Sequence, residues 1–67
     1  MNLTINGELV TVEESIKTIT DLLGFFKLQD KVVIVETNGL IVERTSHDET
    51  NLSDGDKIEI VHFVGGG

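Results

Sequence analysis

The first half of the fold is decided by residues 3–12, which read LTINGELVTV. Apolar and polar side chains alternate on either side of Asn6-Gly7, a dipeptide that favours the two-residue turn of a β-hairpin because both turn residues take a positive φ. Such a turn pairs Ile5 with Glu8 and Leu3 with Val10. The predicted register places four apolar side chains on one face, namely Leu3, Ile5, Val10 and Val12.

A helix is predicted after this hairpin, at about Ile19–Lys27. Its apolar residues recur at i, i+3, i+4 and i+7, which is the spacing of one helix face. Thr18 and Asp21 stand three residues apart at its start, as in a capping box, and an acidic residue in the first turn also suits the helix dipole. The predicted buried face consists of Ile19, Leu22, Leu23 and Phe26.

The second half of the chain predicts three more strands. Residues 32–35 read VVIV, a β-branched run that predicts a strand buried on both faces or nearly so. Leu52 is expected to be a single apolar anchor in a polar region. The other expected segments are an Asn38-Gly39 turn, a short strand at residues 40–42, the polar and irregular residues 44–51, a turn at residues 53–56 and a last strand at residues 57–64.

The predicted order is strand, strand, helix, strand, strand, strand. It implies an α+β domain in which a mixed sheet carries one covering helix on one face, with the first and last strands as central neighbours. This arrangement is the β-grasp, or ubiquitin-like, fold. The predicted domain covers residues 1–64, and residues 65–67 are expected to form a flexible C-terminal glycine tail.

Composition excludes several classes of function. The 67 residues contain no Cys and two His, which excludes disulfides, thiolate metal sites and Cys nucleophiles, and no metal or cofactor is expected. Five basic and twelve acidic residues give a net charge of −7, so nucleic acid and anionic membranes are poor partners. The acidity suits a partner with a basic docking surface, or it serves solubility alone.

No targeting segment and no apolar run of membrane-spanning length is visible in the chain. The chain begins without a basic region followed by a long apolar stretch. A cytoplasmic location is therefore expected.

The last strand predicts a docking surface. If Ile58 and Ile60 face the helix, the two-residue period of a strand places Val61 and Phe63 on the opposite face. Val32 and Ile34 are candidates to join them, and exposed apolar side chains that gather on one face indicate partner docking. A strand twist or bulge that buries Phe63 is the alternative.

The other polar clusters favour structural interpretations. His47-Asp48-Glu49 lies in a polar segment without further spaced ligands and predicts a solvated loop, not a metal site. Asp54 and Asp56 are explained by a turn before the last strand, and His62 by a half-exposed strand position. No pocket is expected in a domain with so small a core.

The chain ends in Gly65-Gly66-Gly67, directly after an apolar strand. Glycine has no Cβ, so such a segment can thread a narrow channel in another protein. An extended stretch from residue 64 to residue 67 reaches about 13 Å at roughly 3.3 Å per residue. The tail could therefore deliver the terminal carboxylate into a partner's active site, where coupling to AMP would make the Gly67 carbonyl reactive.

These features together resemble the ThiS family of sulfur carriers in thiamine thiazole synthesis, within the MoaD/ThiS β-grasp superfamily. The resemblance rests on the glycine ending, on Asp54-Gly55-Asp56 before the last strand, and on TITDLL at residues 18–23. It implies that an adenylating enzyme like ThiF activates Gly67, that a sulfur-donating enzyme makes the thiocarboxylate, and that a thiazole synthase like ThiG accepts the sulfur. Gly66 and Gly65 would thread the channel, although the family needs only two glycines and Gly65 is the additional one.

The resemblance implies a protein co-substrate and not an enzyme. One alternative is a carrier like the small subunit of molybdopterin synthase, which shares the fold, the tail and the activation chemistry. Another is a ubiquitin-like modifier joined to lysine side chains through Gly67. A passive β-grasp interaction module, in which the tail has no role, is the third.

Overall fold

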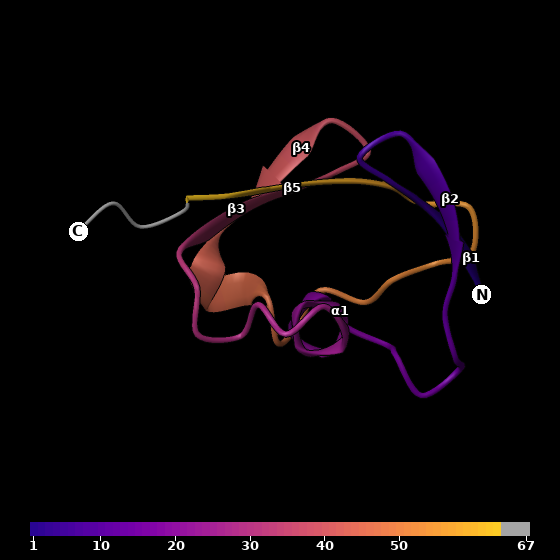
Figure 1. Ribbon diagram of the computed structural model, residues 1–67, viewed down its shortest axis with the longest axis horizontal. Coiled ribbons are helices and arrows are strands. Elements are labelled where there is room, and N and C mark those ends of the chain that lie inside the picture. The colour runs from indigo at the N-terminus through magenta and orange to yellow at the C-terminus, as the bar shows by residue number, and fades with distance from the viewer. Residues whose placement is uncertain (64–67) are drawn as a thin grey trace.

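The computed structural model describes residues 1–63 and shows a mixed five-stranded sheet with one α-helix packed on one face (Figure 1). The sheet order is β2-β1-β5-β3-β4. The predicted α+β, β-grasp arrangement is confirmed. The elements are β1 (Asn2–Ile5), β2 (Glu8–Thr11), α1 (Ile19–Phe25), β3 (Val33–Thr37), β4 (Leu40–Val42), the 3₁₀ turn η1 (Arg44–Ser46) and β5 (Lys57–His62).

The N-terminal hairpin has the predicted register, with Ile5 opposite Glu8 and Leu3 opposite Val10. Asn6 and Gly7 take φ values of 50° and 84°, as the two-residue turn requires. β1 also pairs in parallel with β5, so the first and last strands lie together at the centre of the sheet as predicted.

The side chain of Asn6 extends the pairing between β1 and β5. Its Nδ2 donates to the carbonyl oxygen of Ile60 at 3.0 Å, and the Ile60 N–H donates to Asn6 Oδ1 at 2.8 Å. The amide thus takes the place of a backbone peptide at the point where the β1 backbone turns away. Asn6 therefore serves both the turn and the central strand pair.

α1 begins at the predicted capping box. The Asp21 N–H donates to Thr18 Oγ1, and the Thr18 N–H donates to Asp21 Oδ2, each at 3.1 Å. Hydrogen bonds from the backbone N–H groups of Lys17 and Thr18 lower the pKa of Asp21, because they favour its charged form. The carboxylate is thereby tied to the helix start.

α1 ends at Phe25, two residues before the predicted end. The Leu28 N–H donates to the Leu23 carbonyl oxygen and the Lys27 N–H to that of Gly24, which is the bonding of a Schellman motif. Lys27 takes a left-handed φ of 60°, a conformation usually supplied by Gly, so the sequence offered no glycine signal for this stop.

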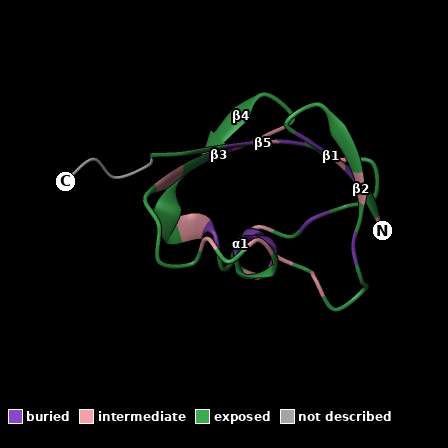
Figure 2. Ribbon diagram, viewed as in Figure 1, coloured by how far each residue is buried: buried purple, intermediate pink, exposed green. Residues whose placement is uncertain are grey.

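The core lies between the sheet and α1, where the buried residues gather (Figure 2). Leu52 is buried, which confirms it as an anchor, and Phe26 of the predicted helix face is half-buried beyond the helix end. The buried apolar residues are Leu3, Ile5, Val12, Ile19, Leu22, Leu23, Val35, Leu52, Ile58 and Ile60.

The prediction that residues 32–35 are buried on both faces is wrong. β3 begins at Val33, Val32 is 65% exposed, Ile34 is 44% exposed, and only Val35 is fully buried. The physical reason is that α1 covers one face of the sheet, while no other described element covers the opposite face (Figure 2). Side chains of β3 that point away from α1 therefore remain in solvent.

The prediction of a solvated loop at residues 47–49 is wrong for His47, which is 6% exposed. Its ring Nε2–H donates to the carbonyl oxygen of Val42 at 3.2 Å. Further backbone bonds hold this segment against α1, including Thr20 N–H to the His47 carbonyl and Ile19 N–H to the Thr50 carbonyl. The loop is thus anchored, while Asp48 and Glu49 are exposed as predicted.

Among the described residues, no helix is both long enough and apolar enough to cross a membrane.

Candidate functional site

The uncovered face of the sheet carries a cluster of exposed apolar side chains. Val61 and Phe63 are 52% and 55% exposed, and Ile58 and Ile60 on the alternate positions are buried against α1. The predicted alternation of β5, in which Val61 and Phe63 lie on the face opposite to the helix, is therefore confirmed. No twist or bulge buries Phe63. Their function as docking residues stays a prediction.

The neighbouring strands complete this cluster. Ile34 of β3 lies directly opposite Val61, and the Phe63 N–H donates to the carbonyl oxygen of Val32 at 3.2 Å. Ile41 of β4 lies opposite Glu36, on the same face as Ile34, and is 68% exposed. We call these residues the open-face patch: Val32, Ile34, Ile41, Val61 and Phe63.

Ile41 is a patch residue that the sequence analysis missed. The sequence does contain a signal for the position of Ile41. The two-residue turn at Asn38-Gly39 pairs Thr37 with Leu40 and Glu36 with Ile41. Carrying that register through β3 to β5 would have placed Ile41 on the same face as Val61.

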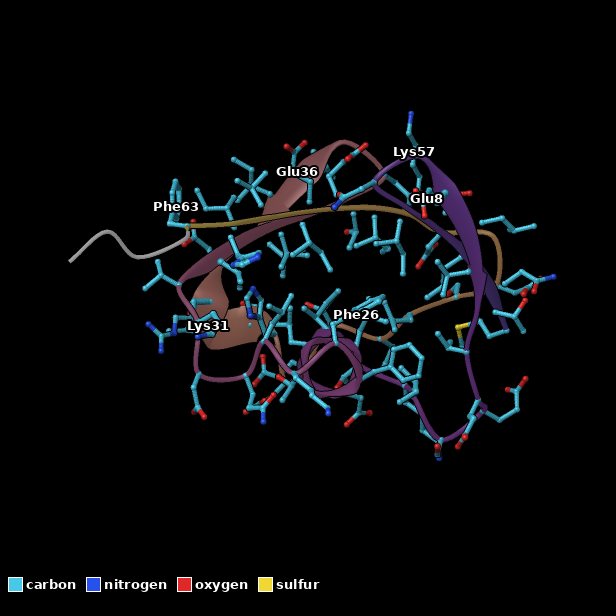
Figure 3. The ribbon with its side chains drawn as sticks, in the orientation of Figure 1. Glu8, Phe26, Lys31, Glu36, Lys57 and Phe63 are labelled. Carbon is cyan, nitrogen blue, oxygen red and sulfur yellow. The ribbon has the colours of Figure 1, made fainter. Side chains whose placement is uncertain are left out.

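A charged band borders the open-face patch. Glu36 lies directly opposite Glu59. Lys57 precedes Glu59 by two residues and lies on the same face of β5. Like charges in opposed positions repel each other, so a cationic group from a partner would be favoured at this place. Figure 3 shows Phe63 at one end of the outer face and Lys57 towards the other.

The three tail residues, Gly65, Gly66 and Gly67, lie outside the described residues, as does residue 64. Their predicted functions and the predicted boundary at residue 64 remain predictions. The described chain ends at Phe63, within the open-face patch and next to Val32.

The remaining polar candidates have structural explanations. Asp54 Oδ1 accepts the Asn2 N–H at 2.6 Å, and Asp56 Oδ2 accepts the Ser53 N–H at 2.8 Å, which confirms the turn interpretation. His62 is an exposed residue at the end of β5, which agrees with the strand position expected of it. Within residues 1–63, no three His, Asp or Glu side chains gather in a way that could hold a metal ion.

Residues 1–63 form at least two open hollows, although no pocket was expected. One, of about 220 Å³, lies beside η1 and the start of β3 and includes Lys31 and Arg44 in its lining. The other, of about 240 Å³, lies between the end of α1 and β5 and is lined mainly by apolar groups, among them Phe26 and Ile60. Both are open to solvent and neither is an enclosed active-site cavity.

Comparisons with known proteins agree with this geometry. Residues 3–67 match the model of the ThiS family. The chain is 48% identical to the sulfur carrier protein ThiS of Bacillus subtilis over 97% of this chain and 98% of that protein. It also superposes on the crystal structure of a thiamine biosynthesis protein (ThiS) from Geobacter metallireducens with a TM-score of 0.82, 43% identity and full coverage of both chains.

Two further relatives are much longer than this chain. The whole chain is 43% identical to part of a thiazole synthase from Paramagnetospirillum magneticum, and the match covers 20% of that protein. A thiazole synthase from Magnetococcus marinus shows the same coverage at 36% identity. In both proteins, a region like this whole chain is part of a much longer polypeptide.

Proposed function

The chain belongs to the ThiS family, and from that premise we propose that it is a sulfur carrier protein of thiamine biosynthesis with Gly67 as the residue that carries the sulfur. The observation that carries the proposal is the near full-length identity of 48% to a sulfur carrier protein. The glycine ending of the chain supplies the group on which such a carrier depends.

The proposed chemistry takes place at the C-terminus, while the folded body provides docking. A carboxylate is a poor electrophile, so the terminal carboxylate of Gly67 first displaces pyrophosphate from ATP on an adenylating partner like ThiF. Sulfide-level sulfur from a sulfur-donating enzyme then attacks the Gly67 carbonyl carbon and displaces AMP as the leaving group, which leaves a thiocarboxylate. Gly65 and Gly66 have no Cβ and can thread the partner's channel. The chain acts as a protein co-substrate.

The proposed acceptor of the sulfur is a thiazole synthase like ThiG. The support is that two relatives named thiazole synthase contain a region similar to this entire chain. A carrier and an acceptor that occur in one polypeptide are held at high local concentration, which favours a working contact between them. The open-face patch, with Val61 and Phe63 beside the end of the described chain, is the proposed contact surface.

The relatives also favour the thiamine branch over the alternatives. Their names refer to sulfur carriage, thiamine biosynthesis and thiazole synthesis. These names favour transfer of sulfur to thiazole synthase over a molybdopterin synthase subunit, a ubiquitin-like modifier or a passive module.

Mass spectrometry tests this proposal. Incubation with ATP, the adenylating enzyme and a sulfur donor should add the mass difference of one sulfur replacing one oxygen, located at Gly67. Deletion of Gly67 moves the carboxyl back by about 3.3 Å and should abolish the change. Gly66→Ala should impair activation strongly and Gly65→Ala less. Sulfur found elsewhere in the chain, or full activation of the Gly67 deletion, would refute the proposal.

A further inference from the structure

The hollow beside η1 brings together two of the five basic residues of an acidic chain. Lys31 and Arg44 both line this opening of about 220 Å³, together with Val32, His47 and Asp48. In the part of the chain that the structure describes, neither Lys31 nor Arg44 makes an ion pair within 4 Å. Two cations thus border one hollow, and the carboxylate in its lining, that of Asp48, forms an ion pair with neither of them.

Arg44 is held at this hollow by an anchored loop. His47 lies buried behind it, with its ring bonded to the Val42 carbonyl oxygen at 3.2 Å, and the His47 N–H donates to the Arg44 carbonyl oxygen. Thr50 Oγ1 closes the loop by donating to the Ser46 carbonyl oxygen at 2.7 Å. The backbone that carries Arg44 is therefore fixed, which reduces the entropy lost when its side chain binds an anion.

The hollow adjoins the open-face patch. Val32 belongs to the patch and also lines the hollow, and Lys31 is its neighbour in the chain. The Phe63 N–H is bonded to the Val32 carbonyl oxygen, so the described chain ends beside both features. Figure 3 shows Lys31 and Phe63 at the same end of the molecule.

From this arrangement we propose that Lys31 and Arg44 bind a carboxylate of the thiazole synthase, an Asp or Glu side chain, when the carrier docks through its open-face patch. The inference rests on the proposed function. A partner surface that covers Phe63 and Val32 comes within reach of Lys31, so the same docking event delivers the acidic side chain to the hollow. The cation pair would then set the orientation in which the acidic carrier meets its partner, because a wrong orientation places like charges together.

The surroundings of the hollow favour a partner's carboxylate over a free phosphate. Asp48 also lines the hollow, with its carboxylate accepting a hydrogen bond from Thr20 Oγ1, and the net charge of −7 repels a dissolved dianion. A carboxylate on a docked partner carries only one charge and is held there by the other contacts, so its effective concentration is high.

Calorimetric titration of the full chain with the thiazole synthase of the same organism tests the proposal. Lys31→Glu and Arg44→Glu should each weaken binding by about tenfold or more, because each puts a like charge against the partner's carboxylate. Lys27→Glu is the matched control, since it makes the same change in net charge at an exposed residue outside the hollow, and it should stay within about twofold of the wild type. Lys31→Arg keeps the charge and should also bind within about twofold.

Each outcome decides between the proposals. Equal weakening by Lys31→Glu and Lys27→Glu, in a wild type that binds, would overturn this inference and leave the proposed function intact. Binding of inorganic phosphate to the free chain, lost in Arg44→Glu without any effect on synthase affinity, would assign the hollow to small anions and also overturn it. A wild-type chain that does not bind the synthase would refute both proposals.

Discussion

Truncation of Phe63 to Ala should weaken binding of the thiazole synthase about 30-fold. Phe63 leaves 55% of its surface exposed, and a Phe side chain can bury roughly 150–250 Å², so about 100 Å² remains for a partner to cover. At about 25 cal/mol per Å², that area corresponds to roughly 2.5 kcal/mol, of which the Cβ retained by Ala keeps a part. A loss of about 2 kcal/mol is a factor of about 30 in the dissociation constant.

Phe25→Ala is the matched control for this truncation. Phe25 is the same residue type and is 46% exposed, but it lies at the end of α1 on the other layer of the fold. Calorimetric titration of both variants should show the loss for Phe63→Ala alone. Urea unfolding followed by circular dichroism should place Phe63→Ala within about 1 kcal/mol of the wild type. Equal affinities of the two variants, or an unfolded Phe63→Ala, would refute the assignment of Phe63 to the docking surface.

Three further predictions concern the fold that presents this surface. Leu23→Ala, at a buried position of α1, should lower the free energy of unfolding by about 2–5 kcal/mol in urea melts, and a loss below about 1 kcal/mol would contradict its place in the core. Asn6→Gly keeps the positive φ of the turn but removes both bonds to Ile60, so it should cost about 1–3 kcal/mol, and an unchanged melting curve would show that the amide bridge adds no stability. Asp21 has a lowered pKa in the folded chain, so its contribution is present above about pH 4 and is lost as the pH falls through the folded pKa; stability of Asp21→Asn should depend less on pH between about pH 5 and pH 2, and parallel pH profiles would contradict this.

The elements that the sequence predicted well are those with local signals. The Asn6-Gly7 turn sets the hairpin register by itself, because the turn and the alternation of Leu3 and Ile5 indicate the same pairing. The capping box of Thr18 and Asp21 likewise marks the helix start within four residues. The alternation at the start of β5 assigned Ile58 and Ile60 to the helix side, and the two-residue period of a strand then predicted the exposure of Val61 and Phe63.

The features that the sequence predicted wrongly depend on tertiary contacts. The β-branched run at residues 32–35 has the composition of a two-sided buried strand, but composition does not reveal that α1 covers only one face of the sheet. His47 is buried because Val42 offers a carbonyl oxygen five residues away, which no pattern in the polar segment indicates. The early end of α1 depends on Lys27 in a conformation that favours glycine.

Along β5, residues that stabilise the fold alternate with residues that can contact a partner. Between Lys57 and Val61, the even-numbered Ile58 and Ile60 are buried against α1, while the odd-numbered Lys57 and Val61 face solvent and Glu59 is partly exposed. In a deep mutational scan of this strand, substitutions at the buried positions should lower the abundance of the protein in the cell. Substitutions at the solvent-facing positions should instead change which partner the protein binds. Lineages of such a domain can exchange partners through the odd positions without first acquiring stabilising changes elsewhere.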